Sequence, residues 1–300
     1  MGIVVIGSVA LDSVVTPHGY MKNALGGSAT YFSLAASLYN TVDVIATVGK
    51  DFPRAHLEFF KSRGIGIDGL EVADGKTFRW EGRYDAENLN MAHTLATHLN
   101  VFKDFDPRIP KKLAESPYLF LANIDPDLQY KVLRQIRDPR LVACDSMNFW
   151  ITHKRSSLVG ILPKIDIFFL NDTEAQSLTG ENNLLRAAKA VLRMGPGMAI
   201  VKKGEHGVLC VTKKYLIAFP AYPVEVVRDP TGAGDSFAGG IMGYLSTVGS
   251  CNEARMKRAL THGTIIASFT VEGFGVSRLA KVTKKEIAER IVRFKQIIAA

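Results

Sequence analysis

Cysteine is scarce in this chain, which has only Cys144, Cys210 and Cys251 among its 300 residues and no Cys-x-x-Cys pair. An odd number of widely spaced cysteines excludes a disulfide framework and indicates a reducing compartment. Each cysteine is then expected to act as a small hydrophobic residue of the core. His206 and His262 have no cysteine or histidine neighbours at zinc spacing, so a zinc site is excluded there.

Long apolar runs are also lacking. No stretch approaches the roughly 20 residues of a membrane-spanning helix, and the apolar run that begins at Ile3 is too short for a signal peptide. We therefore expect a soluble, cytoplasmic protein that does not engage a membrane. The net charge is +8, but the lysines and arginines are scattered, so we predict a solvated basic surface and no nucleic-acid partner. A nucleic-acid-binding protein would instead bind duplexes in a strongly salt-dependent way.

Short apolar runs alternate with helical patterns along the whole chain. The runs that predict buried parallel strands lie near residues 3–6, 43–49, 118–122, 141–144, 165–170 and 198–201. This alternation predicts an α/β fold with a doubly wound, mostly parallel sheet flanked by helices, formed as one domain by residues 1–300. Residues 64–70, rich in glycine, are interpreted as a loop.

A second type of strand pattern interrupts this series. Residues 76–84, and more loosely 94–102, alternate aromatic or apolar residues with charged or polar ones, which favours a half-exposed antiparallel sheet. We predict a small sheet built from roughly residues 10–22 and 75–103. Trp80, Tyr84 and Asn90 are candidates for touching a ligand from that sheet, although sheet packing explains each of them as well.

The most informative stretch is Asp229-Pro-Thr-Gly-Ala-Gly-Asp235-Ser-Phe-Ala-Gly-Gly240. Pro230 prevents a helix from entering from upstream, and the apolar run after Asp235 predicts a buried helix. A glycine loop that leads into a helix N-terminus presents free backbone N–H groups and binds anions, phosphate above all. Asp235 is then either a helix N-cap or a base that accepts a proton beside the phosphate.

This stretch resembles the C-terminal signature of the ribokinase-like (PfkB) carbohydrate kinase family. The resemblance implies that Asp235 is the catalytic base, and that Gly232, Ala233 and Gly234 form an anion hole with it for the transferring phosphoryl group. It also implies a small sheet that closes as a lid over the substrate. The chain has no Gly-x-x-x-x-Gly-Lys-[Ser/Thr] motif and is therefore not a P-loop enzyme.

A second stretch, residues 25–31, resembles the N-terminal signature of the same family. The resemblance implies that Gly26, Gly27 and Asp12 line the substrate pocket. Tyr31 stands where ribokinase-type sequences carry Asn, so the sugar contacts at that position need not transfer. Asn123, which follows a predicted strand, is a further candidate for substrate binding.

Three segments are candidates for metal binding. Asn171 and Glu174 have the spacing of a helix capping box, and the same spacing matches the family's Asn-x-x-Glu motif, which implies Mg²⁺ held through water. Asp145 begins a modified form of the family's Asp-x-Asn segment, in which Trp150 replaces the usual Arg, and is a weaker metal candidate. Some relatives bind a monovalent cation such as K⁺ near the positions of Asp229 and Thr231.

The resemblance also implies where ATP binds. The candidate nucleotide contacts are Asn171, Lys202, Gly204, Thr231, Gly232, Gly234, His262 and Gly263, with the adenine placed beside Gly263.

The sequence thus predicts an ATP-dependent phosphotransferase that acts on a hydroxyl group, typically a hydroxymethyl group, of a sugar or sugar-like molecule. A nucleoside kinase of the same fold is the alternative within the class, and a non-catalytic nucleotide or sugar sensor is the alternative outside it. An intact Asp235 argues against the sensor, since a sensor needs no base. A homodimer formed through the lid sheet is a further expectation.

Overall fold

The computed structural model describes residues 2–299. The strands are β1 (Ile3–Ile6), β2 (Ala10–Thr16), β3 (Gly19–Gly26), β4 (Val42–Gly49), β5 (Ile65–Ala73), β6 (Arg79–Asp85), β7 (Asn88–His98), β8 (Tyr118–Leu121), β9 (Leu141–Cys144), β10 (Ile167–Asn171), β11 (Met198–Lys202), β12 (Val208–Thr212) and β13 (Leu216–Phe219). The helices are α1 (Ser28–Ala36), α2 (Arg54–Ser62), α3 (Pro126–Leu133), α4 (Asn148–His153), α5 (Arg155–Ile161), α6 (Asp172–Thr179), α7 (Leu184–Arg193), α8 (Ala233–Val248), α9 (Glu253–Thr270) and α10 (Lys284–Ile298). Short 3-10 turns lie at Asn100–Asp104, Lys111–Leu113, Leu162–Lys164, Gly204–His206 and Leu279–Lys281.

The main sheet is the predicted doubly wound one. Within residues 2–299 it has nine strands in the order β13-β12-β11-β10-β9-β8-β1-β4-β5. Of these, β12 is antiparallel to both of its neighbours, β11 and β13, so β13 runs in the same direction as the remaining strands. The apolar runs produce this sheet because helices cover both of its faces, so that all four residues of β1 are buried. The strand order reverses at β1, between β4 and β8, and ligands of open α/β sheets bind beyond the carboxyl ends of the strands at such a point.

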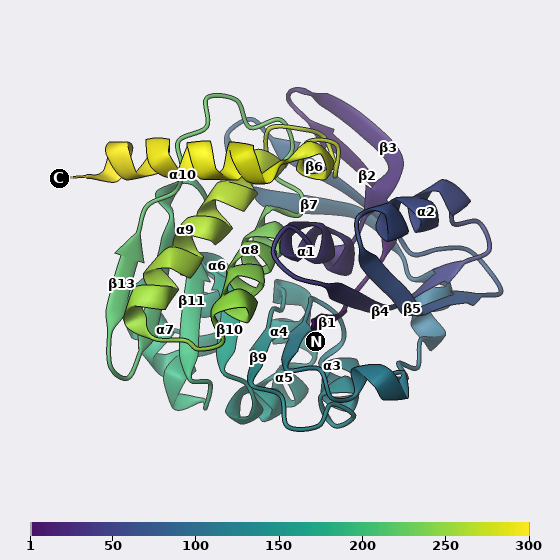
Figure 1. Ribbon diagram of the computed structural model, residues 1–300, viewed down its shortest axis with the longest axis horizontal. Helices are drawn as coiled ribbons and strands as arrows, with labels where there is room; N and C mark the ends of the chain where they lie inside the picture. Colours follow the sequence, from purple (N-terminus) through teal and green to yellow (C-terminus); the bar gives the residue numbers. More distant parts are fainter. Residues whose placement is uncertain (1, 300) are drawn as a thin grey trace.

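Two apolar cores hold the helices against this sheet. One face packs against α1, α2, α8, α9 and α10 through side chains such as Phe32, Phe60 and Phe294. The other face packs against helices α3 to α7 through side chains such as Val132 and Leu158. Figure 1 shows α1, α8 and α9 lying together in front of the sheet, with α10 across their end.

The prediction of a loop at residues 64–70 was wrong, because most of this segment belongs to β5. That strand pairs in parallel with β4 at the edge of the main sheet. The glycines that suggested a loop are needed for this pairing: a Cβ on Gly66 would lie 2.0 Å from Asp43 Oδ1, and one on Gly69 would lie 2.2 Å from Ile45 Cδ1.

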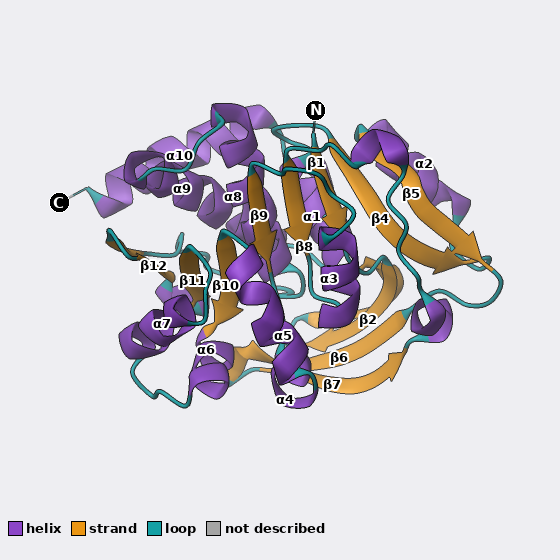
Figure 2. Cartoon of the chain, turned by 90° about the horizontal axis from the view of Figure 1, so that it is seen from below, coloured by secondary structure: helices purple, strands orange, loops and turns teal. Residues whose placement is uncertain are grey.

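A four-stranded sheet of order β3-β2-β6-β7 forms the lid. Figure 2 shows β2, β6 and β7 crossing beyond the arrowheads of the central main-sheet strands. The predicted segments supply this lid, but β3 runs on to Gly26, and β2 pairs with β6 in parallel rather than antiparallel. The lid exposes Val15, Tyr20, Met91 and Leu95 to solvent, and the expected homodimer through this sheet stays a prediction.

Candidate active site

The glycine loop and α8 have the predicted arrangement. Gly232 adopts φ 75°, a left-handed conformation that favours glycine, and α8 begins at the next residue. No side chain caps this helix, so Asp235 is not its N-cap, and that interpretation was wrong. The start of α8 therefore combines backbone N–H groups that no side chain caps with a carboxylate in the first turn.

Asp235 stands beside a group of charged residues. Burial and the nearby charge of Asp145 raise the pKa of Asp235 to about 8, although Lys202 lowers it in part. Lys202 Nζ lies 2.7 Å from Asp145 Oδ2. A Cβ on Gly234 would lie 3.1 Å from Lys202 Nζ, so this glycine leaves room for the lysine beside α8.

Three adjacent strands of the main sheet supply this group. Asp145 directly follows β9, Asn171 ends β10, and Lys202 ends β11 opposite Asn171 in the parallel register. Side chains that are far apart in the sequence meet here because parallel strands end at the same edge of the sheet.

Asn171 and Glu174 form the capping box expected from their spacing. Asn171 Oδ1 accepts a hydrogen bond from the backbone N–H of Glu174 at 2.7 Å, and Glu174 Oε2 accepts one from the N–H of Asn171 at 2.7 Å. Glu174 is 6% exposed, and burial raises its pKa to about 7 despite the opposing charge of Lys202.

These residues fit a magnesium ion held through water. The cap occupies one oxygen of Glu174 and the amide oxygen of Asn171, whereas Oε1 of Glu174 has no protein partner among the described hydrogen bonds. Residues 2–299 contain no group of three or more His, Cys, Asp or Glu side chains arranged to hold a metal directly. Mg²⁺ commonly keeps several waters and binds through one or two carboxylates together with phosphate oxygens, which is compatible with this set.

The loop before α8 is held by Asp229, which is 1% exposed. Its two oxygens accept hydrogen bonds from the backbone N–H groups of Thr231 at 2.9 Å and Gly275 at 2.8 Å. Burial raises the pKa of Asp229, and the two N–H donors oppose that rise. These donors already compensate the carboxylate, and the monovalent cation expected at Asp229 and Thr231 stays a prediction.

Asp12, whose charge also acts on Asp235, meets the glycine pair. Asp12 Oδ2 accepts a hydrogen bond from the N–H of Gly27 at 3.1 Å. A Cβ on Gly26 would lie 1.9 Å from the same oxygen, so only glycine leaves space for this carboxylate. Asp12 is 3% exposed, and burial raises its pKa to about 7.

Two tyrosines complete this part of the site. Tyr31, from α1, is buried with its ring directly beneath Gly232, where a Cβ would lie 2.2 Å from the ring. Tyr84, from the lid, is also buried, and its hydroxyl lies 3.4 Å from Thr231 Oγ1. We call the group formed by Asp12, Gly26, Gly27, Tyr31 and Tyr84 the closed side of the site, because the lid covers it.

Asn123 borders the closed side and has a partner that the sequence did not indicate. Its backbone oxygen lies 3.4 Å from Ser28 Oγ, next to Gly27. Its side-chain oxygen accepts a hydrogen bond from Trp150 Nε1 at 3.0 Å. In the sequence, Trp150 stood out only because it replaces the Arg of the family's pattern. In the structure it bonds to Asn123, which is a candidate for substrate binding.

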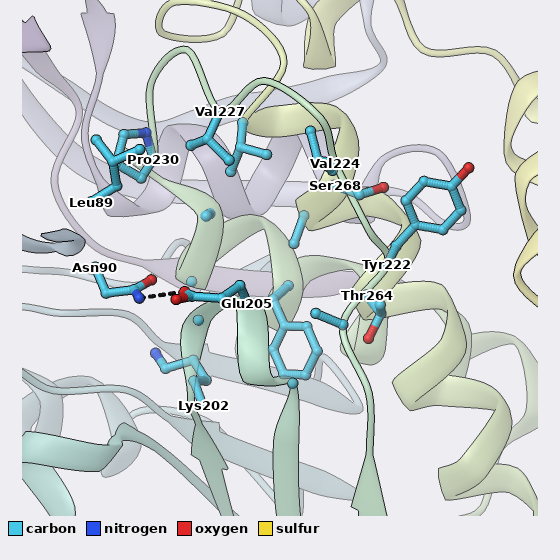
Figure 3. A pocket seen from close by; sticks show the side chains of 18 of the residues that line it. Leu89, Asn90, Lys202, Glu205, Tyr222, Val224, Val227, Pro230, Thr264 and Ser268 are labelled. Carbon is cyan, nitrogen blue, oxygen red and sulfur yellow. Dashed lines mark hydrogen bonds between the residues drawn. The ribbon is translucent and has the colours of Figure 1, made fainter. Parts of the chain in front are cut away.

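A cavity of about 640 Å³ is lined by Ala233, Gly234 and Phe237 at the start of α8 and by residues of other elements (Figure 3). We call it the open cavity. Its lining includes the predicted residues Lys202, Gly204 and Gly234. The residues that sequence reasoning missed come mainly from α9, from the proline-containing segment before α8 and from the lid turn: Thr264, Ala267, Ser268, Val271, Tyr222, Val224, Val227 and Leu89. Apolar residues in loops carry no motif, so no sequence pattern indicated these contacts.

Three predicted contacts lie elsewhere than expected. Gly263 packs α9 against α8, since a Cβ there would lie 2.8 Å from Phe237 O, and His262 bonds to the hydroxyl of Tyr39 at 3.0 Å. Neither residue lines the open cavity, because that surface of α9 begins at Thr264. Asn90, suggested as a substrate contact, lines the open cavity and bonds to Glu205 (Figure 3).

Comparison with known proteins agrees with this geometry. The model of the pfkB family carbohydrate kinases matches residues 2–282, and the chain belongs to that family. It is 29% identical over 261 residues to a cytidine kinase of Thermococcus kodakarensis, covering 81% of this chain and 88% of that protein. It is 28% identical over 261 residues to a nucleoside kinase of Methanothermobacter thermautotrophicus, covering 85% of this chain and 81% of that protein.

The fold is shared with solved kinases as well. A putative ribokinase II from Escherichia coli, solved in complex with ATP and Mg²⁺, superposes with a TM-score of 0.80 at 19% identity, over 97% of this chain and 99% of that one. The protein is thus a kinase that transfers a phosphoryl group to a sugar or nucleoside acceptor. Over residues 2–299, no helix is both long and apolar enough to span a membrane.

Proposed function

We propose that this kinase transfers the γ-phosphoryl group of ATP to a hydroxymethyl group of a nucleoside, with Asp235 as the base. The position of Asp235 carries the proposal. Its carboxylate lies close enough to Asp12 on one side, and to Asp145 and Lys202 on the other, for all three charges to act on its pKa. Asp12 belongs to the closed side and Lys202 lines the open cavity, so Asp235 is near a group from each, as the base must be where an acceptor and a phosphoryl donor meet.

Asp235 has the chemistry that the transfer requires. The raised pKa, about 8, makes its carboxylate a stronger base than an ordinary aspartate, close to the pH at which proton transfer is efficient. In this mechanism Asp235 accepts the proton of the attacking hydroxyl. The backbone N–H groups at Gly232, Ala233 and Gly234 and the ammonium group of Lys202 stabilise the charge on the transferring phosphoryl group.

The donor side of the mechanism uses the open cavity. Its volume suits a nucleotide, and its lining is largely apolar apart from Lys202 and a few polar groups. Asn171 and Glu174, with Asp145 nearby, would hold Mg²⁺ through its waters, and that ion would neutralise phosphate charge. Gly204 and Thr231 stay candidate nucleotide contacts, whereas His262 and Gly263 are not included.

A nucleoside is favoured as the acceptor because of the relatives. The two that match across about four fifths of this chain are a cytidine kinase and a nucleoside kinase. The buried Asp12 on the closed side would accept hydrogen bonds from sugar hydroxyls, and Asn123 would contact the same acceptor. Free sugars that present a hydroxymethyl group are the second candidate class, and a panel of nucleosides, pentoses and hexoses tested for acceptor-dependent ADP release separates the two.

Replacing Asp235 by Asn tests the base directly. We expect kcat to fall about 10²–10⁴-fold, since general-base catalysis contributes that much, while the nucleotide still binds. Steady-state ADP release and nucleotide titration measure the two effects. The matched control is Asp74→Asn, which makes the same change in a carboxylate side chain that is 87% exposed and should leave both values unchanged. Near-normal turnover in Asp235→Asn would refute the assignment.

A further inference from the structure

The lid reaches the open cavity as well as the closed side. Residues 86–90, at the tip of the hairpin formed by β6 and β7, all line the open cavity, as do Lys202 and Gly234. We call residues 86–90 the lid turn. In Figure 3, Leu89 of the lid turn lies toward the same end of the cavity as Pro230, which comes just before the glycine loop. The lid turn therefore borders the end of the cavity where the phosphates of a nucleotide would lie.

Asn90 joins the lid turn to the main domain. Its side-chain N–H donates a hydrogen bond to Glu205 Oε2, on the turn between β11 and β12 (Figure 3). Gly204 makes room for this contact, because a Cβ there would lie 2.0 Å from Asn90 Oδ1. Within the lid turn, the backbone N–H of Asn90 donates to Asn88 Oδ1 at 3.0 Å. Asn90 is thus bonded both to its own turn and to the opposite wall of the cavity.

The other strand of the hairpin is tied to the same side of the site. The hydroxyl of Tyr84, on β6, lies 3.4 Å from Thr231 Oγ1 in the loop before α8. The lid hairpin therefore contacts the main domain through Tyr84 on one strand and Asn90 on the other. The lid turn lies between these two contacts, so its position over the open cavity depends on both of them.

The bond between Asn90 and Glu205 is suited to placing the lid turn and contributes little to the stability of the fold. The hydrogen bond from Asn90 lowers the pKa of Glu205, so the acceptor is a carboxylate at neutral pH, and such charge-assisted bonds are stronger and shorter than neutral ones. The side chain of Glu205 is nevertheless 66% exposed, and exposed polar pairs add little to the free energy of unfolding.

We propose that the lid turn forms part of the nucleotide site, and that Asn90 is the positioning residue that fixes it there through Glu205. The inference rests on the proposed function, which places ATP in the open cavity, and it adds the lid to the elements that contact the donor. A lid turn without this bond would sample several conformations. ATP would then have to order the turn as it binds, and that ordering lowers the affinity.

Asn90→Ala tests the proposal, because it removes the donor and keeps the backbone of the hairpin. We expect the affinity for ATP, measured by titration with Mg²⁺ and without acceptor, to fall about 3–10-fold. The nucleotide KM should rise by a similar factor, while kcat and the acceptor KM stay within about twofold of wild type. The melting temperature should not change. A merely structural role would instead lower the melting temperature and worsen the kinetics of both substrates together.

A second variant tests the partner of Asn90. In a Glu205→Ala background, Asn90→Ala should have no further effect on ATP affinity, since the bond is already lost. Met91→Ala is the matched control: it truncates the next side chain of β7, which is 50% exposed and does not line the open cavity. That variant should bind ATP as wild type does.

The outcomes separate this inference from the proposed function. Unchanged ATP affinity in Asn90→Ala would overturn the inference, and so would an equal loss in the Glu205→Ala background, because Asn90 would then act without Glu205. Failure of the wild type to bind ATP would overturn the proposed donor, and the inference with it. Near-normal turnover by Asp235→Asn concerns the base alone and leaves the role of the lid turn standing.

Discussion

The closed side and the open cavity differ in the kind of surface that they offer to a ligand. The closed side is small, covered by the lid and built from buried polar groups, of which Asp12 and Tyr31 are at most 3% exposed. The open cavity holds about 640 Å³ and is lined mostly by apolar side chains and backbone. Buried polar groups must be matched by a ligand or left unpaired, whereas an apolar lining tolerates imperfect fits.

With the acceptor proposed on the closed side and the nucleotide in the open cavity, we expect selectivity to arise mainly on the closed side. A kinase of this kind should discriminate sharply among acceptors and less sharply among nucleotide bases. Three changes test that comparison, beginning with the largest expected effect.

Asp12→Asn should weaken acceptor binding most. The neutral amide keeps the size of the side chain but loses the charge that strengthens a hydrogen bond from a sugar hydroxyl, so we expect the acceptor KM to rise about 10–100-fold. The nucleotide KM should not change. Steady-state kinetics with each substrate varied in turn measure both values.

The contrast with Asp235→Asn sharpens this test. That variant should lower kcat with little change in the acceptor KM, because a base acts in the transition state rather than in substrate binding. Equal effects of Asp12→Asn on both substrates would contradict the division between the two sides.

The stability of the ligand-free protein should fall as the pH rises. The pKa of Asp12 is raised to about 7 and that of Asp235 to about 8, chiefly by burial. A carboxyl group with a raised folded-state pKa binds its proton more tightly in the folded protein. Its contribution to the free energy of unfolding is thus complete below the unfolded pKa of about 4 and is lost as the pH rises through the folded pKa.

The dependence is measured by urea unfolding in the absence of nucleotide and metal. The experiment covers about pH 5 to pH 9, a range that spans both raised pKa values. The double variant Asp12→Asn/Asp235→Asn should show a flatter pH dependence than wild type. Glu205 of the open cavity should not contribute in this direction, since the hydrogen bond from Asn90 lowers its pKa. An unchanged slope in the double variant would show that Asp12 and Asp235 are not the source of the pH dependence.

Trp150→Phe should have the smallest effect. It removes the indole N–H that bonds to Asn123 Oδ1 and so frees the orientation of that amide, and we expect the acceptor KM to rise about 3–10-fold. Nucleotide binding should be unaffected. In an Asn123→Ala background the same substitution should have no further effect, and an additive loss would show that Trp150 acts independently of Asn123.

Local patterns predicted much of the fold. Continuous apolar runs indicated β1, β8 and β9, because only strands covered on both faces are apolar at every position. The failure at β5 has a physical reason. Gly66 and Gly69 have the composition of a loop, but their role is to let the edge strand approach Asp43 and Ile45, which are adjacent only in the folded sheet.

The residues of the site likewise fall into those that local sequence patterns indicated and those that only the folded structure brings together. The glycine loop with Asp235 and the capping box of Asn171 and Glu174 are local in sequence, so spacing alone indicated them. The hydrogen bond of Trp150 with Asn123 joins α4 to the loop that follows β8, and no spacing in the sequence encodes it. The displacement of His262 and Gly263 from the open cavity depends on how α9 rotates against α8, which is a property of packing.

The sequence by itself determined the alternation of strands and helices, the phosphate loop with its carboxylate, and the membership of a kinase family, because each depends on residues within about a dozen positions of one another. The tertiary structure alone decided that Asp12, Tyr31, Tyr84 and Asp235 meet at one point, and that the hydroxyl of Tyr31 is left there without a partner. Burial is the physical reason: it is a property of the assembled molecule, and it makes these polar groups depend on a ligand.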